Sequence, residues 1–293
     1  MSFDEIDISE DKHFSGYQSN LDYASHVLFG VPHDMTLSYR TGAREGPSKI
    51  REASQNIEGM SSFSGRDISE LRIHDLGNLS LVGSHSQRLK QVEQCLLEVK
   101  KLDKVPIMLG GEHSITISVV DSLPHSSGLV IFDAHSDLRE DYLGEHFSHA
   151  CTTRRLLDKK KPEDILQIGV RATSMDEKEW LEGNPSLTQI SSLQVHQQGL
   201  EVCAQVIQSF IDQHSSIYVS LDIDCFDPAY APGTGTPEPM GLSPFQVFSF
   251  IHHIPAPKIC GIDLVEVSPT HDHGGITSVL AARTLFELLL TKK

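Results

Sequence analysis

One stretch of the sequence sets three ionisable side chains directly after a run of apolar residues; it reads Leu129-Val-Ile-Phe-Asp-Ala-His-Ser-Asp137. Side chains two residues apart on an extended chain point to the same face, so Asp133, His135 and Asp137 can converge where a buried strand ends. Burying three ionisable groups together is costly unless they have partners. Because a metal ion accepts carboxylate and imidazole ligands together, the stretch predicts a metal site.

Two further stretches repeat this arrangement. Asp222 and Asp224 follow the apolar run 216–221, and His113 follows the short run 105–109 and two glycines that let the backbone turn sharply. The three stretches together supply four aspartates and two histidines, a set suited to two divalent cations roughly 3.5–4 Å apart that activate one water. Carboxylate-rich ligation with one imidazole for each metal favours two Mn²⁺ ions over a structural Zn²⁺. With a bridging hydroxide the site would carry one net negative charge, which suits a cationic substrate.

These stretches resemble, in the same order, the motifs of the ureohydrolase family, which includes the arginases and agmatinases. The resemblance extends from about residue 26 to the C-terminus, and Glu112 departs from it because many members have Asp there. The matching segments are Phe29-Gly-Val-Pro-His-Asp34, Ser38-Tyr-Arg-Thr-Gly-Ala-Arg-Glu-Gly-Pro47, Gly110-Gly-Glu-His-Ser114, Phe132-Asp-Ala-His-Ser-Asp137, Ser220-Leu-Asp-Ile-Asp-Cys-Phe-Asp-Pro228, Ala231-Pro-Gly-Thr-Gly-Thr-Pro237 and Asp263-Leu-Val-Glu-Val-Ser-Pro269.

The resemblance implies two Mn²⁺ ions per subunit, held by six residues. The implied ligands are His113, Asp133, Asp137 and Asp222 for one ion, and Asp133, His135, Asp222 and Asp224 for the other. Glu266 matches the residue that holds the substrate guanidinium, a task that suits a carboxylate because it accepts two parallel N–H bonds. His149 aligns with the mobile active-site histidine of the family, with the nearby His146 as the alternative. Asp137 would orient the attacking hydroxide and relay its proton to the leaving amine.

The substrate is predicted from one position beside these ligands. Arginases hold the amino-acid end of arginine with an Asn where this chain has Arg139, and agmatine lacks the carboxylate that such a clamp binds. Residues 137–151 resemble agmatinases, particularly prokaryotic ones. We therefore expect a manganese amidinohydrolase that converts agmatine and water to putrescine and urea, through attack of the metal-bridging hydroxide on the guanidinium carbon. Guanidinobutyrate and arginine stay open as substrates.

Two other classes of protein compete with this prediction. A binuclear metallophosphoesterase also begins its site with Asp-x-His, but it needs later Gly-Asp and Asn-His pairs that this chain lacks in the right order. Its phosphate substrate would also require Arg or Lys beside the metals. A non-catalytic metal-binding member of the family would keep the ligands and lose the substrate carboxylate, which is present here as Glu266.

The composition limits the binding partners and the cellular compartment that we expect for this protein. The 293 residues carry a formal net charge of −16, which disfavours nucleic acid because phosphate binding requires clustered Lys and Arg. The five cysteines form no Cys-x-x-Cys pair and indicate reduced thiols in a cytoplasmic protein. The acidic N-terminus lacks a signal sequence, and no stretch approaches the roughly 20 apolar residues of a membrane span. The family resemblance implies a homo-oligomer, a trimer or hexamer.

Alternating strand and helix patterns predict a three-layer α/β fold whose mostly parallel, eight-stranded sheet is flanked by helices. Helices are expected at 86–102, from residue 46 onward and at 275–290, and the last of these is apolar nearly all round. Residues 1–25 are interpreted as an N-terminal arm and 26–293 as a single catalytic domain. In such sheets ligands bind at the carboxyl ends of the strands, where all three metal stretches lie. The expected strands are 26–31, 71–76, 105–109, 129–133, 165–170, 187–190, 217–222 and 259–264.

Overall fold

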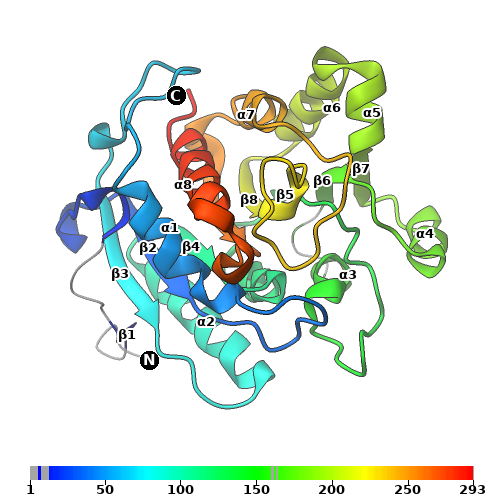
Figure 1. Ribbon diagram of the computed structural model, residues 1–293, viewed down its shortest axis with the longest axis horizontal. Coiled ribbons are helices and arrows are strands. Elements are labelled where there is room, and N and C mark those ends of the chain that lie inside the picture. The colour runs from blue at the N-terminus through cyan, green and yellow to red at the C-terminus, as the bar shows by residue number, and fades with distance from the viewer. Residues whose placement is uncertain (1–5, 8–12, 160–161, 163, 293) are drawn as a thin grey trace.

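Nine strands form one continuous sheet with helices on both faces in the computed structural model, which describes residues 6–7, 13–159, 162 and 164–292 (Figure 1). The strand order is β1-β3-β2-β4-β9-β8-β5-β6-β7. Strands β2 to β9 are all parallel, and β1 pairs antiparallel with β3 at one edge. The bounds are β1 (Ile6–Asp7), β2 (His26–Val31), β3 (Ile73–Leu79), β4 (Val105–Gly110), β5 (Ser127–Phe132), β6 (Asp164–Val170), β7 (Leu187–Ser191), β8 (Ser216–Asp222) and β9 (Ile259–Val265).

All eight predicted strands form, and the predicted three-layer α/β architecture is confirmed. The sequence does not predict β1, and it ends β3 too early, at residue 76. Gly77 and Asn78 are typical of a turn. Here the guanidinium of Arg51 donates to the Gly77 carbonyl oxygen at 2.9 Å and to Asn78 Oδ1 at 2.6 Å, and it pairs with Asp75 at 2.8 Å. These bonds satisfy the polar groups of the strand, which therefore continues to Leu79.

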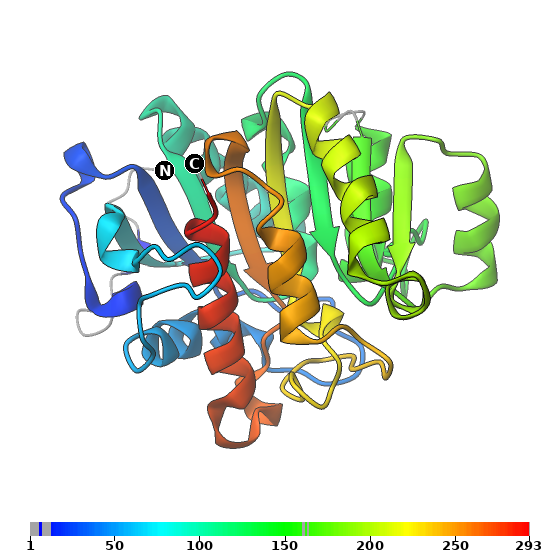
Figure 2. The same cartoon turned by 90° about the horizontal axis from the view of Figure 1, so that it is seen from above.

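Helices cover the two faces of the sheet and enclose two hydrophobic cores. Helices α6, α7 and α8 lie side by side on one face, where α1 packs against α8 (Figure 2). Helix α2, the 3₁₀ helix η6 and helix α3 pack together over the other core. The apolar C-terminal helix is thus buried within its own chain over most of its length, although Ile276 and Val279 in its first turn are exposed. The bounds are α1 (Gly46–Ser54), α2 (His85–Lys101), η6 (His113–Ser122), α3 (Thr152–Asp158), α4 (Met175–Glu182), α5 (Ser192–Gln198), α6 (Leu200–Gln213), α7 (Pro244–Ile251) and α8 (Ile276–Leu289).

The segment before β2 contacts the rest of the chain. Phe14 is fully buried in a core and packs edge-on against Phe286 of α8, with ring centres 5.3 Å apart. The side-chain amide of Gln18 donates to the Asp75 carbonyl oxygen at 3.0 Å. Residues 1–5 and 8–12 of the predicted arm lie outside the described residues, so the arm and the boundary at residue 25 stay predictions. Among the described residues, no helix has both the length and the apolar character that crossing a membrane requires.

Candidate metal centre and substrate pocket

The predicted site residues follow four strands that are neighbours at the centre of the sheet. These strands lie in the order β4, β9, β8, β5. His113, Glu266 and Asp133 come shortly after β4, β9 and β5, and Asp222 is the last residue of β8. Parallel strands present their carboxyl ends at one edge of a sheet, so adjacent strands bring these side chains together. His113 and Glu266 are 153 residues apart in the sequence and are nevertheless hydrogen-bonded. The long connections after β2 (blue) and β8 (yellow) lie along this same edge (Figure 2).

The first candidate metal group surrounds the ring of His113 with three carboxylates. The Nδ1 atom of His113 lies 3.1 Å from an oxygen of Asp133, and 3.3 Å from an oxygen of each of Asp137 and Asp222. All four side chains are buried. They are the four residues that the family resemblance assigns to one ion.

The second candidate metal group centres on His135 and shares Asp133 with the first. His135 Nδ1 lies 3.0 Å from Asp224 Oδ2 and 3.6 Å from Asp133 Oδ1. Backbone amides orient the carboxylates, because His135 N donates to Asp133 Oδ1 at 2.7 Å and Ala134 N donates to Asp224 Oδ1 at 3.1 Å. Asp222, which lies against His113 in the first group, also accepts the Asp224 backbone N–H at 2.9 Å through its Oδ1 and so borders the second group. The structure thus brings all six predicted ligands together.

A hydrogen-bond chain behind His113 leaves its Nδ1 atom as a lone-pair donor. The Ser220 hydroxyl donates to Asp263 Oδ1 at 2.6 Å, so its oxygen accepts from His113 Nε2 at 3.1 Å. A neutral imidazole carries a single N–H, so Nδ1 then turns a lone pair toward three carboxylates. Among the described residues, neither His113 Nδ1 nor Asp133 Oδ2 has a hydrogen-bond partner. Because a buried lone pair facing carboxylates needs a cation between them, these residues fit a metal ion.

The electrostatics of the cluster lead to the same conclusion. Burial, together with the neighbouring Asp224 and Asp133, raises the pKa of Asp222 well above its ordinary value. Burial and Asp133 likewise raise the pKa of Asp137 to about 7. Burial favours the neutral ring of His113, but the surrounding carboxylates outweigh it and raise the pKa of that ring well above its ordinary value. The carboxylates therefore favour a positive charge at Nδ1, which either a proton or a metal ion bound to the lone pair would supply. The cluster therefore holds more buried negative charge than its own side chains neutralise, and divalent cations would balance that charge.

Glu266 is buried beside the first group and has one oxygen free. Its Oε1 accepts the His113 backbone N–H at 2.7 Å, whereas its buried Oε2 has no hydrogen-bond partner in the part of the chain that the structure describes. Burial, with the charge of Glu112, raises the pKa of Glu266 well above its ordinary value. An unpartnered buried carboxylate oxygen is a receptor for a cationic N–H donor.

Two of these acidic residues have left-handed backbone conformations. The φ angle is 51° at Asp137 and 65° at Glu266, which is unusual for residues other than glycine. Such conformations cost about 1–3 kcal/mol and persist where the surrounding structure fixes them, often at functional sites.

The two glycines before His113 are required for a reason other than the predicted sharp turn, because neither Gly110 nor Gly111 has a positive φ. A Cβ atom on Gly111 would lie 1.8 Å from the His33 carbonyl oxygen, so the two backbones approach too closely for a side chain.

His149, and not His146, lines the cavity beside the metal groups. The exposed His146 instead lies with its Nδ1 atom 3.0 Å from the Glu140 carbonyl oxygen. The ring of His149 meets Tyr142 edge-on, with ring centres 5.7 Å apart. Burial, with the nearby rings of His135 and His113, lowers the pKa of His149 to about 4, so its ring is neutral at neutral pH.

Thr36 fixes which nitrogen of His149 carries the proton. The Thr36 hydroxyl donates to Glu112 Oε1 at 2.8 Å, and its oxygen accepts the His149 backbone N–H at 3.1 Å. The Thr36 oxygen also lies 3.0 Å from His149 Nδ1. Because the hydroxyl proton is already donated to Glu112, Nδ1 must be the N–H donor of this pair, and Nε2 is left as the acceptor. Thr36 is a residue that the sequence analysis misses.

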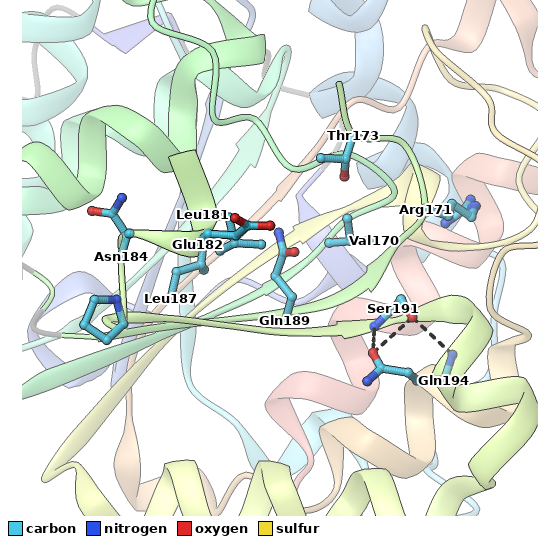
Figure 3. A pocket seen from close by; sticks show the side chains of 12 residues that line it. Val170, Arg171, Thr173, Leu181, Glu182, Asn184, Leu187, Gln189, Ser191 and Gln194 are labelled. Atoms are coloured by element: carbon cyan, nitrogen blue, oxygen red, sulfur yellow. Dashed lines mark hydrogen bonds between the residues drawn. The ribbon is translucent and has the colours of Figure 1, made fainter. Parts of the chain in front are cut away.

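The cavity that contains these side chains has a volume of about 350 Å³ and is lined by residues from six loops. Besides the predicted residues it includes Ser38, Arg139, Tyr142, Thr236 and Glu238. A larger cavity of about 860 Å³ lies beside it, next to β7 and α4, and shares Thr173 with it (Figure 3). Gln194 and Ser191 on its wall bond each other in a helix cap, and none of the six candidate metal ligands lines it (Figure 3). The chemistry therefore belongs to the smaller cavity.

Comparisons with known proteins agree with this geometry. The family model described as the arginase family matches residues 24–291. The agmatinase of Bacillus subtilis is 34% identical to this chain over 99% of both chains. The crystal structure of the agmatine ureohydrolase of Thermoplasma volcanium is 39% identical, with a TM-score of 0.85 over 93% of this chain and 91% of that one. The proclavaminate amidinohydrolase of Streptomyces clavuligerus is 31% identical, with a TM-score of 0.86 over 95% and 96% of the two chains.

Proposed function

Because the chain belongs to the arginase family, we propose that this ureohydrolase is an agmatinase, which hydrolyses agmatine to putrescine and urea with two Mn²⁺ ions. The single observation that carries the proposal is the buried Glu266 carboxylate, whose free Oε2 atom lies in the same pocket as the two candidate metal groups. A guanidinium is flat and cationic and presents several N–H donors, so it matches a carboxylate in this position. A non-catalytic metal-binding protein would have no use for that carboxylate.

The six ligands favour manganese. His113, Asp133, Asp137 and Asp222 would hold one ion, and Asp133, His135, Asp222 and Asp224 the other. Three carboxylates and one imidazole for each ion suit Mn²⁺ better than Zn²⁺ in a closed structural site. When bound, two such cations supply Lewis-acid activation of a water, so that hydroxide is available near neutral pH.

The side chains of this chain perform the remaining steps. Glu266 binds the guanidinium and holds its central carbon toward the metal groups, which is catalysis by positioning. Attack of hydroxide on that carbon forms a C–O bond, and the C–N bond to the alkyl amine then breaks. Asp137 accepts the proton of the nucleophile and delivers it to the departing nitrogen, so that the amine leaves with its proton. His149, with Nε2 free as an acceptor, takes part in proton transfer at the pocket wall.

Other guanidino compounds are the main alternative substrates. Arg139 lines the pocket and would favour a substrate whose tail is anionic, such as guanidinobutyrate. The chain is also similar to a proclavaminate amidinohydrolase, which is named for a substrate other than agmatine. A metallophosphoesterase is disfavoured, because seven acidic or imidazole side chains, the six candidate ligands and Glu266, dominate the centre. A homo-oligomer and a cytoplasmic location stay predictions from the family resemblance and the composition.

The test is urea release from the Mn²⁺-loaded protein with agmatine, arginine and guanidinobutyrate compared side by side. We expect a marked preference for agmatine. Glu266→Gln should abolish urea release while leaving two metal ions per subunit, measured by elemental analysis, because the variant keeps the shape and loses the charge. Full activity in Glu266→Gln would contradict the mechanism, and preference for another guanidine would change the substrate and keep the mechanism.

A further inference from the structure

The carboxylates of the substrate pocket are nearly all engaged. Asp137 and Asp222 belong to the candidate metal groups, and Glu266 lies beside them. Glu177 accepts hydrogen bonds from the Leu138 amide at 3.0 Å and from the Ser174 amide and hydroxyl at 2.7 Å each. Its carboxylate is thus saturated as part of the cap of helix α4. None of these groups is available to the far end of a substrate.

Glu238 is the exception among the described residues that line the pocket. It is partly buried, and no hydrogen bond or ion pair of its side chain is found in the described part of the chain. Its backbone, in contrast, is firmly held. It lies between Pro237 and Pro239, whose rings fix their own φ angles and restrict the residues before them.

Arg171 anchors the same loop to the metal centre. Its guanidinium donates to the Glu238 carbonyl oxygen at 2.9 Å and to the Pro239 carbonyl oxygen at 3.1 Å. It also donates at 2.7 Å to the carbonyl oxygen of Asp224, a candidate metal ligand. One side chain therefore ties the backbone of Glu238 to the second metal group. A backbone that is already fixed contributes no further loss of conformational freedom when the side chain of Glu238 binds a ligand.

We propose that Glu238 binds a cationic group at the far end of the substrate chain and thereby selects alkyl guanidines that carry a terminal ammonium. This inference rests on the proposed ureohydrolase function and adds the residue that determines the choice of substrate. Glu266 would hold the guanidinium, and Glu238 the second positive charge of the same molecule. Arg139, whose guanidinium carbon lies 5.2 Å from the ring centre of Tyr142, is drawn to that ring and does not pair with Glu238.

The test compares three substrates of equal chain length in wild type and Glu238→Gln. All three have a four-carbon chain: agmatine carries a terminal ammonium on it, n-butylguanidine has a hydrogen in place of that ammonium, and in 4-guanidinobutyrate the last carbon is a carboxylate. We expect Glu238→Gln to lower kcat/KM for agmatine about 10- to 100-fold, the range for losing a hydrogen bond to a charged group. The value for n-butylguanidine should stay within about twofold, and that for 4-guanidinobutyrate should not fall.

A matched control removes one negative charge outside the pocket. Glu182 is exposed and lines the neighbouring cavity, so Glu182→Gln should leave all three substrates unchanged (Figure 3). The preference of the wild type for agmatine over n-butylguanidine should also decrease with ionic strength, and in Glu238→Gln it should not.

The outcomes separate the two levels of the proposal. Equal losses for agmatine and n-butylguanidine in Glu238→Gln would show a structural role for the loop and overturn the assignment, as would no loss for either. A wild type that prefers n-butylguanidine or 4-guanidinobutyrate would overturn it too, while leaving the ureohydrolase function intact. Absence of urea from every guanidine would instead contradict the proposed function itself.

Discussion

Replacing Thr36 by Val removes a hydroxyl and preserves the shape of the side chain. That hydroxyl donates to Glu112 Oε1 at 2.8 Å and accepts from His149 N at 3.1 Å, with His149 Nδ1 at 3.0 Å. In the variant the ring of His149 loses the acceptor that holds its proton on Nδ1. The neutral ring is then free to place the proton on Nε2, which is the nitrogen that the mechanism requires as an acceptor.

The magnitude follows from the bonds that are lost. An unsatisfied polar group costs about 1–3 kcal/mol, but Ser148 Oγ lies 3.3 Å from His149 Nδ1 and is a replacement partner. We therefore take the lower part of that range, about 1–2 kcal/mol, which corresponds to a fall in kcat/KM of about 5- to 30-fold. Thr36→Ser keeps the hydroxyl and should retain most of the activity.

The assay combines kinetics with the ¹⁵N chemical shifts of the His149 ring, recorded with diamagnetic Mg²⁺ in place of Mn²⁺ and assigned with His149→Asn. Thr36→Val should reduce the fraction of the ring with the proton on Nδ1, and Thr36→Ser should leave it unchanged. If Thr36→Val lowers activity with wild-type ring shifts, Thr36 acts through packing and the tautomer argument is wrong. Wild-type kinetics in Thr36→Val would refute it as well.

Two further predictions concern stability. Chelating the divalent cations should lower the melting temperature, and added Mn²⁺ should restore it, because the cluster is rich in unneutralised negative charge. A ligand that binds only the folded chain and is present at 100 times its Kd adds about 2.7 kcal/mol to the unfolding free energy. Asp133→Asn should respond much less to chelation, and a wild-type melting temperature that ignores the chelator would contradict the metal assignment. Burial lowers the pKa of His26 on β2 from 6.5 to about 4, so the unfolded chain binds more protons between these values. The part of the unfolding free energy that depends on a neutral His26 is therefore fully present above about pH 6.5, and it is lost as the pH falls toward 4. Between pH 7 and pH 5 the wild type should lose about 2 kcal/mol more unfolding free energy than His26→Asn in urea titrations, and equal losses would show that His26 is not desolvated.

The candidate metal ligands could be predicted because their signal is local. Each ligand lies within five residues of the end of an apolar strand, and parallel strands deliver their carboxyl ends to one edge without any knowledge of the loops. The same logic yields the eight parallel strands. It fails for β3, where the turn-like Gly77 and Asn78 continue the strand because Arg51, 26 and 27 residues earlier, bonds them.

Residues that depend on where loops fold could not be predicted in this way. Thr36 meets Glu112 across 76 residues and His149 across 113, and a single threonine in a loop has no periodic pattern to reveal it. Glu238 gave a partial signal, since a charged residue between two prolines is held rigidly, but its place in the pocket depends on Arg171, 67 residues earlier. The residues at the strand ends therefore determine the metal chemistry, whereas the loops that follow several of these strands determine which substrate is bound. Substitutions at positions 139 and 238 should thus change which guanidine is hydrolysed, and substitutions at position 36 should change the rate, while all of them leave the metal content unaltered.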